Sequence, residues 1–310
     1  MIIFTLSTTV SNKIKRGRDL HGLVVLDKPL NISSNHALQR VKRLLNAKKA
    51  GHTGTLDPLA TGVLVLCLGR ATKIADHVAN ADKRYFVVAK LGQQTQTGDL
   101  EGEVIKQTQV SEQHLAQVPA VIAQFIGSIE QIPPMYSALK KDGVALYKLA
   151  RQGTEVERSA RTVSIAHIGI NDISHDTVSM TVACSKGTYI RTLVEDIGKT
   201  LGCYAHVHTL RRLSVGQFGD NYPMVSLEDI EQRAHQGQNL EHFILPARAA
   251  FSQYPAITLN DGLILMLEKG RKLKLSAENT SGFIRIIDTH EIFRGLADVE
   301  QGQIVKFRQF

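Results

Sequence analysis

Cysteine is scarce in this sequence, and the few cysteines stand far apart. Cys67, Cys184 and Cys203 form no C-x-x-C pair and are odd in number, which argues against a disulfide framework and against a zinc site. Cys67 and Cys184 lie in apolar runs, where a cysteine is usually a small core residue. The cysteine pattern therefore fits a reducing compartment and predicts no metal.

Long apolar runs are also missing. The longest, residues 63–68, has about a third of the length needed to cross a bilayer. Residues 1–6 are apolar but too few for the core of a signal peptide, and the basic residues follow them instead of preceding them. We therefore expect a soluble, cytoplasmic protein with no membrane association.

Several well-known catalytic motifs are absent. No G-x-S-x-G, H-E-x-x-H or G-x-G-x-x-G occurs, so serine hydrolase, zinc protease and dinucleotide-binding functions lose their usual support. The GKT at residues 198–200 lacks the upstream glycine of a phosphate-binding loop and falls within a predicted helix. The chemistry must come from another kind of site.

Positive charge, in contrast, is plentiful. The 310 residues carry a formal net charge of +8, which favours a polyanion as partner, either a nucleic acid or an acidic membrane surface. The basic residues gather in two clusters, Lys13, Lys15, Arg16 and Arg18, and then Arg40, Lys42, Arg43, Lys48 and Lys49. Each cluster could equally be a solvated face, so charge alone leaves the partner open.

The first hundred residues read as short strands joined by polar segments. Residues 22–26 predict a buried strand, and an amphipathic helix capped by Ser33 or Ser34 follows, with a basic wet side. Residues 51–62, GHTGTLDPLATG, predict a structured loop. A buried strand at 63–68, a short helix at 72–79 and a strand at 85–91 come next.

The rest of the chain divides into three parts. Residues 131–161 are basic and weakly periodic, which predicts an excursion from the sheet, either an arm that contacts the partner or a basic surface loop. Residues 177–184 alternate as a half-buried strand, and Thr188 can cap a helix that Gly202 ends. After about residue 252, short strand candidates predict a small β-rich C-terminal domain.

Asp57 is the single acid in the loop at residues 51–62. Pro58 follows it and biases the aspartate toward an extended backbone. His52, Thr53 and Thr55 lie close enough in sequence to offer hydrogen bonds that could keep the carboxylate ionised. The residues alone leave two interpretations, a catalytic carboxylate and an aspartate that merely closes a turn.

Five stretches follow one another along the chain: GLVVLDKP at 22–29, AGHTGTLDPLATGVL at 50–64, DKRY at 82–85, SKGTYIRTL at 185–193 and HTLRRL at 208–213. Together they resemble the TruB family, the tRNA pseudouridine synthases that act on uridine-55 of the T-arm. The resemblance covers the central part of the chain and is weakest over about the last sixty residues. The basic segment before His21 looks like an addition to the family pattern.

The resemblance implies a fold and a domain organisation. It implies an α/β (α+β) catalytic domain at residues 1–250, built on a mixed, mainly antiparallel sheet. A thumb-like segment that grips RNA would be inserted at about 131–161. Residues 251–310 would form a small β-rich domain similar to the PUA module.

The resemblance also implies an activity. The enzyme would flip a uridine out of the T-arm loop of tRNA, because the glycosidic bond of a stacked nucleotide is out of reach. Asp57 would then act either as nucleophile or as base, and the residues do not decide between these roles because both require an ionised carboxylate. The isomerisation conserves every atom and needs no cofactor. We expect tRNA as partner, a monomer, no obligate protein partner and an accessory role in tRNA folding.

Five further residues receive roles from their matching positions. Arg191 would pair with Asp57 and lower its pKa. Tyr85 would stack on the flipped uracil, and Tyr85 or water would accept the C5 proton. Tyr189 and Leu210 would line the uracil pocket, and His52 would help to occupy the space that the base leaves.

Two other functions remain in view. A catalytically silent RNA-binding or RNA-folding protein would differ only at Asp57, Tyr85 and Arg191, all of which are present. A metal-dependent hydrolase of phosphate esters is less favoured, because such chemistry usually needs several convergent ligands and the loop offers one carboxylate and one histidine.

Overall fold

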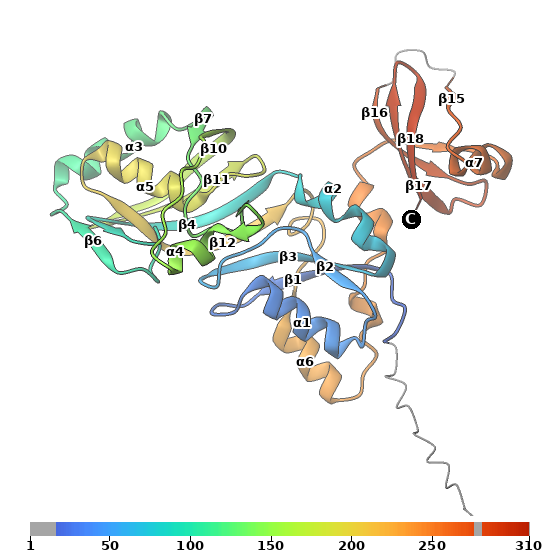
Figure 1. The fold of residues 1–310 in the computed structure, drawn as a ribbon, viewed down its shortest axis with the longest axis horizontal. Coiled ribbons are helices and arrows are strands. Elements are labelled where there is room, and N and C mark those ends of the chain that lie inside the picture. The colour runs from blue at the N-terminus through green and yellow to red at the C-terminus, as the bar shows by residue number, and fades with distance from the viewer. Residues whose placement is uncertain (1–16, 276–280, 310) are drawn as a thin grey trace, which may run out of the picture.

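A mixed sheet forms the body of the molecule in the computed structural model, which describes residues 17–275 and 281–309 (Figure 1). Within these residues it has nine strands in the order β13-β1-β3-β12-β4-β11-β10-β7, with β2 also paired to β3. They are β1 (Gly22–Lys28), β2 (Ala50–His52), β3 (Ala60–Leu68), β4 (Lys83–Leu91), β7 (Gly127–Gln131), β10 (Arg161–Ser174), β11 (Thr177–Cys184), β12 (Ala205–Val215) and β13 (Val225–Ser226). The pairs β1–β13 and β3–β12 are parallel and the remaining pairs are antiparallel, which confirms the expected mixed, mainly antiparallel α/β (α+β) fold.

Hydrophobic patterning explains which strands lie in the middle. β11 alternates partly exposed and buried residues along its whole length, as the sequence predicts for a strand with one buried face. β3 is instead buried almost throughout, because apolar clusters cover both of its faces. The continuous apolar run at residues 63–68 therefore indicates a strand that is buried on both faces of the sheet.

Helices cover the sheet, and the first residues of one of them, α5, line the pocket described below. They are α1 (Ser34–Leu44), α2 (Ala75–Ala79), α3 (Glu112–Ala123), α5 (Ile190–Leu201) and α6 (Leu227–His235), with 3-10 turns at Gly69–Ile74, Glu241–Phe243 and Ala247–Phe251. Ser33 caps α1 through the amide of His36, and Gly202 ends α5 with φ 80°. The expected Thr188 cap is wrong: Tyr189 is the N-cap of α5, and the Thr188 hydroxyl donates to the carbonyl of Ser185.

The glycine-rich stretch at residues 51–62 is a loop only in its middle. Its first residues belong to β2, and its last three form the start of β3, where residues 60–62 pair with β12. Gly62 has φ 98°, and a Cβ there would lie 2.1 Å from the carbonyl oxygen of Arg212. Pairing between distant segments therefore overrides the local signal, and the expectation of a loop at both ends was wrong.

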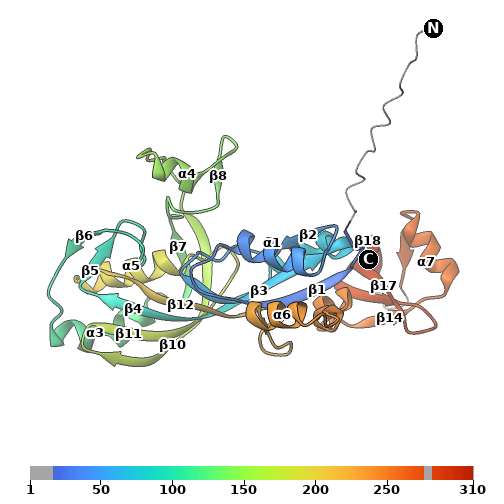
Figure 2. The same cartoon turned by 90° about the horizontal axis from the view of Figure 1, so that it is seen from below.

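Residues 132–160 leave the sheet after β7 and return to it at β10. The segment holds the short strands β8 (Lys140–Lys141) and β9 (Val144–Ala145) and the helix α4 (Leu146–Arg151). Figure 2 shows α4 and β8 standing well away from the sheet. A smaller hairpin, β5 (Gln93–Thr95) and β6 (Val104–Gln107), follows β4.

A second sheet forms at the C-terminal end, in agreement with the β-rich C-terminal part expected from the sequence. Its order is β14-β16-β17-β18-β15, and it has an apolar cluster of its own that includes Ile284 and Ile286. The elements are β14 (Ala256–Thr258), α7 (Asp261–Glu268), β15 (Leu273–Lys274), β16 (Gly282–Ile287), β17 (Phe293–Glu300) and β18 (Gln303–Gln309). The sequence interpretation missed α7, which Asn260 caps.

The helices are short throughout residues 17–275 and 281–309. None of those described there combines the length and the apolar character that spanning a bilayer demands.

Candidate active site

Five of the six predicted site residues line one cavity, which we call the catalytic pocket. It has a volume of about 350 Å³. Its walls come from the loop at residues 54–57, from β4, from residues 137–139 of the inserted segment, from the start of α5 with the residues before it, and from β12. They include Asp57, Tyr85, Tyr189, Arg191 and Leu210. A larger cavity of about 600 Å³ lies between α2 and the C-terminal strands, but its walls contain none of the six. The catalytic pocket is therefore the candidate site.

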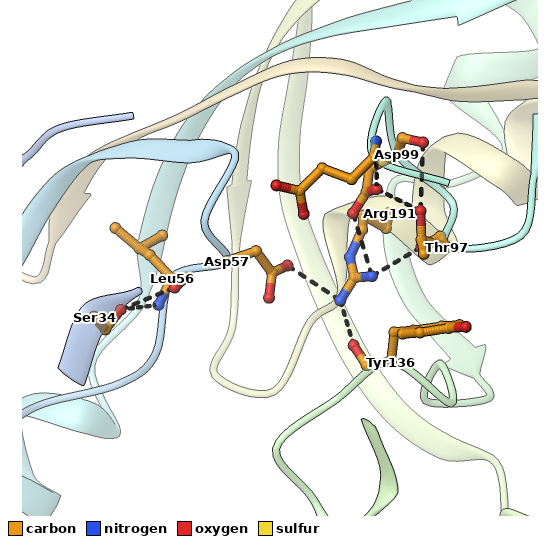
Figure 3. A network of polar contacts seen from close by, with 8 residues as sticks. Ser34, Leu56, Asp57, Thr97, Asp99, Tyr136 and Arg191 are labelled. Carbon is orange, nitrogen blue, oxygen red and sulfur yellow. Dashed lines mark hydrogen bonds and ion pairs between the residues drawn. The ribbon is translucent and has the colours of Figure 1, made fainter. Parts of the chain in front are cut away.

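Asp57 stands on a loop that is anchored at the neighbouring residue Leu56 by Ser34 (Figure 3). The buried Ser34 hydroxyl, at the start of α1, donates to the Leu56 carbonyl at 2.9 Å and accepts the Leu56 amide at 2.7 Å. On the other side, the Pro58 carbonyl accepts the Asn31 amide at 2.9 Å. Because its two neighbours are held in this way, the Asp57 backbone has one defined position.

Arg191 joins Asp57 to a second carboxylate. Its side chain is 6% exposed, and one guanidinium nitrogen lies 3.1 Å from Asp57 Oδ2 while the other lies 3.4 Å from Asp99 Oδ2. The same two nitrogens donate to the carbonyls of Tyr136 at 2.6 Å and Thr97 at 2.8 Å (Figure 3). Each terminal nitrogen of the guanidinium thus has two oxygen partners, and the sequence-predicted partners Asp57 and Arg191 are brought together.

The electrostatics of Asp57 differ from the sequence expectation. Burial raises the pKa of its carboxyl above the usual value, and the nearby Asp99 raises it further. Arg191 and Lys28 lower it, but they do not outweigh burial. Arg191 thus lowers the pKa as expected, but the net shift is upward, because the desolvation of Asp57 in the pocket wall could not be seen in the sequence.

Asp99 is a site residue that the sequence analysis missed. It is buried, its Oδ1 accepts the Thr97 hydroxyl at 2.5 Å and the Glu101 amide at 3.1 Å, and its Oδ2 faces Arg191. In the sequence it lies in the polar stretch at residues 92–103, which reads as an ordinary connection. Only the packing of the β5–β6 turn against α5 reveals its role as a partner of the arginine.

Tyr85 and Arg212 lie opposite each other on the adjacent strands β4 and β12. Tyr85 is 8% exposed and pairs in register with Arg212 of β12. Burial raises the pKa of the Tyr85 hydroxyl, so the phenol is protonated at neutral pH and is not a ready proton acceptor. Arg212, 2% exposed, donates to the Val63 carbonyl at 2.7 Å and to the Gly54 carbonyl at 3.3 Å.

Arg212 was also missed, although it lies within the HTLRRL motif. No local pattern indicates that an arginine in this strand would be buried at a pocket wall. Lys83, another wall residue, has its pKa lowered to about 8 by burial first and by Arg212 second. The wall of the pocket therefore holds three cations, Lys83, Arg191 and Arg212, together with the carboxylate of Asp57.

His52 lies apart from the other predicted residues. It belongs to β2, beside β3, and is not among the residues that line the pocket. Burial and the neighbouring Arg212 lower the pKa of its imidazole, so the ring is neutral at pH 7. Its Nδ1 is buried and has no hydrogen-bond partner in the described part of the chain.

Metal-ligand groupings can be assessed for the described ranges 17–275 and 281–309. No three His, Cys, Asp or Glu side chains gather there in a way that could hold a metal ion.

Comparison with known proteins places this geometry in context. Residues 42–190 match the model of the TruB family pseudouridylate synthase N-terminal domain, and residues 191–252 match that of the tRNA pseudouridylate synthase B C-terminal domain. A tRNA pseudouridine synthase B from Nitrosococcus oceani is 46% identical, with 94% of this chain and 96% of that protein covered. The protein of the same name from Histophilus somni is 43% identical, with 96% of each chain covered.

Solved structures agree with the fold. A chain in the crystal structure of a Cbf5–Nop10–Gar1 complex aligns with a TM-score of 0.70 at 25% identity, covering 94% of this chain and 84% of the other. A chain from an H/ACA RNP bound to a substrate RNA containing 2'-deoxyuridine aligns with a TM-score of 0.69 at 23% identity, covering 93% and 84%. From the family models and the relatives together, the chain belongs to the TruB family of pseudouridylate synthases.

Proposed function

We propose that this chain converts uridine-55 in the T-arm loop of tRNA to pseudouridine, with Asp57 as the catalytic carboxylate. The observation that carries the proposal is the placement of Asp57. Its carboxylate lies at the wall of a pocket of about 350 Å³ and is paired with Arg191 on a loop anchored by Ser34. A cavity of this size is within the range of small-molecule sites and can receive one everted pyrimidine nucleoside.

The proposed reaction needs four changes of bonding and one rotation of the base. The N1–C1′ bond breaks, the uracil turns within the pocket, and C5 bonds to C1′, after which C5 loses its proton and N1 gains one. Asp57 either adds to the substrate or removes a proton from the sugar, and both roles require the ionised form. Arg191 favours that form against the opposing effect of burial. No atom is gained or lost, so no cofactor is needed.

The remaining pocket residues would hold the base. Tyr85 offers an aromatic ring, and stacking on such a ring is worth about 1 to 3 kcal/mol per base. Tyr189 and Leu210 line the same cavity and would enclose the uracil. Because the pKa of the Tyr85 phenol is raised, we favour water over Tyr85 as the acceptor of the C5 proton. His52, outside the lining, would contact the RNA loop.

The same proposal covers partner and domains. Residues 1–250 would be the catalytic domain and 251–310 a PUA-like domain, with the inserted segment at about 131–161 gripping RNA. The enzyme would act as a monomer on tRNA in the cytoplasm, without a membrane or an obligate protein partner, and could also assist tRNA folding. Of the basic residues that would contribute, Lys13, Lys15 and Arg16 lie outside the described residues.

The direct test of this function uses purified wild-type protein and a T-arm stem-loop, with neither metal nor nucleotide added. Mass-spectrometric mapping with a pseudouridine-specific label is expected to find one modified position, the uridine that corresponds to residue 55 of tRNA. Modification elsewhere would replace the proposed target, and an unmodified RNA that nonetheless binds would favour the silent RNA-binding alternative.

RNA binding by the inserted segment predicts a dependence on salt. Lys140 and Lys141 are exposed at its tip. If each contacts a phosphate, the double change Lys140→Gln and Lys141→Gln should reduce the slope of log Kd against log salt by about 1.4 to 1.8. Filter binding between low and moderate salt measures the slope. Lys199→Gln, an exposed lysine at the end of α5, serves as control and should leave it unchanged; equal slopes in all three proteins would argue against this contact.

A further inference from the structure

Gln131 is a buried amide with an unusual partner. It is the last residue of β7, is 2% exposed, and pairs in register with Arg161 of β10. The inserted segment therefore begins immediately after Gln131 and ends immediately before its strand partner. A buried amide side chain must find hydrogen bonds, and those of Gln131 are made outside its own sheet.

Both amide atoms of Gln131 bind the backbone of one residue, Tyr189. Its Oε1 accepts the Tyr189 amide at 3.0 Å, and its Nε2 donates to the Tyr189 carbonyl at 3.3 Å. Two bonds to the N–H and C=O of a single residue set both its distance and its direction, much as a pair of ladder bonds does in a sheet. The side chain acts as a clamp on that residue.

The clamp falls at the start of the helix that carries Arg191. Tyr189 is the N-cap of α5, and no side chain of the helix's own supplies a capping bond. Arg191 follows two residues later, in the first turn. The first turn of a helix leaves four N–H groups without partners inside the helix and so depends on outside contacts. The position of Tyr189 therefore strongly influences that of Arg191.

A second contact links the same two regions. The Tyr136 carbonyl, five residues beyond Gln131 in the inserted segment, accepts the Arg191 guanidinium at 2.6 Å. The root of the inserted segment thus holds α5 at its backbone through Gln131 and at its arginine through Tyr136. The arginine can reach Asp57 at 3.1 Å only while α5 begins where it does.

We propose that Gln131 is a positioning residue for the reaction, which holds Arg191 against Asp57 by clamping the backbone of Tyr189. This inference rests on the proposed function, since it assigns the clamp a role in that chemistry. Misplacing a catalytic group by about 1 Å can cost about 100-fold in rate, so loss of the clamp should slow turnover far more than it weakens RNA binding.

The charged groups around the Asp57–Arg191 pair also influence how the rate depends on pH. The charged or titratable groups that act on Asp57 or Arg191 come from β1, β4, the β5–β6 turn and α5 with its N-cap, and they are Lys28, Tyr85, Asp99, Glu101, Tyr189 and Glu195. None of them changes in the variants below. A shift in the pH profile would therefore report the position of Arg191.

The experiment compares Gln131→Met with Gln217→Met. Methionine is close to glutamine in size and flexibility but makes neither bond. Gln217 also binds backbone, donating to the Ala249 carbonyl, but it lies between β12 and β13, away from the catalytic pocket. Single-turnover rates on a T-arm stem-loop would be measured against pH, together with Kd and Tm.

Gln131→Met is expected to lower the single-turnover rate about 10- to 100-fold, to move the acid limb of the profile to higher pH, and to change Kd less than about twofold. Gln217→Met should lower Tm without moving the limb. If Gln131→Met only lowers Tm, with rate and limb unchanged, the positioning role is refuted. If it does not fold, Gln131→Asn, one methylene too short for both bonds, is measured in its place and carries the same expectations.

Two kinds of failure can be told apart. Wild-type protein that makes no pseudouridine would overturn the proposed function and leave nothing for Gln131 to position. Wild-type protein that is active, with a Gln131 variant equally active across the pH range, would overturn the inference alone.

Discussion

Asp57→Asn is expected to make no measurable pseudouridine while still binding RNA. The amide has nearly the shape of the carboxylate, so the anchored loop and the pocket should persist. It cannot serve as nucleophile or as base; loss of a general base costs about 10²- to 10⁴-fold in rate, and loss of a nucleophile can cost about 10⁶-fold. RNA affinity should change little, because in the proposed function basic residues outside the pocket supply most of the binding to RNA. Single-turnover product formation and filter binding measure the two properties.

The control for this variant is Asp176→Asn. Asp176 also pairs with a cation, Lys90, at 2.5 Å and is 42% exposed, compared with 36% for Asp57. It lies in the turn between β10 and β11, outside the catalytic pocket. Full activity in the control and none in Asp57→Asn would assign the effect to the site. Turnover by Asp57→Asn at a rate near that of wild type would refute the catalytic role.

Arg191→Met is expected to have the second-largest effect. The change removes the cation between Asp57 and Asp99 and leaves the two carboxylates facing a buried apolar chain. Arg191 is the largest influence that lowers the pKa of Asp57, so its loss raises that pKa further. The ionised form, which the reaction needs, exists above the pKa and is lost as pH falls through it. The acid limb of the rate profile should therefore move to higher pH.

The rate of Arg191→Met at neutral pH should also fall, by about 100-fold, because the carboxylate loses both its charge partner and its orientation. Removing one partner of a buried ion pair typically costs about 3 to 5 kcal/mol of stability, so Tm must be followed alongside. Arg191→Lys keeps the positive charge but not the two-nitrogen geometry of the guanidinium. Its rate should therefore lie between those of the wild-type protein and Arg191→Met. A limb that stays in place or moves to lower pH in Arg191→Met would contradict this account of the pair.

Local pattern was sufficient for most strands and for the helix α5, but not for its start. The apolar stripe and Gly202 predict the body and end of α5, whereas Thr188 offers a plausible cap that the fold does not use. The Thr188 hydroxyl donates to the carbonyl of Ser185, and Gln131 binds the backbone of the next residue, Tyr189. Helix ends depend on partners from distant segments, and no local pattern contains those partners.

The contrast between local pattern and distant partners also separates the site residues that the sequence predicted from those that it did not. Asp57, Tyr85 and Arg191 lie in short motifs that could be matched one by one. Asp99 and Gln131 lie in stretches that look like an ordinary connection and an ordinary strand end, and only packing brings them to α5.

The sign of the Asp57 pKa shift was missed for a related reason. The sequence showed the cation that would stabilise the carboxylate, but it could not show how much water the folded pocket excludes. Burial outweighs Arg191 in the structure. The direction of a pKa shift in a pocket thus needs the three-dimensional surroundings as well as the partner.

The most direct test of the central claim is a crystal structure of Asp57→Asn bound to an unmodified T-arm stem-loop. The account predicts that the target uridine is everted into the catalytic pocket, stacked on Tyr85, with the residue 57 side-chain oxygen about 3 to 3.5 Å from the reacting ribose or base. A target uridine that stays stacked in the RNA loop, or that enters a different cavity, would contradict it.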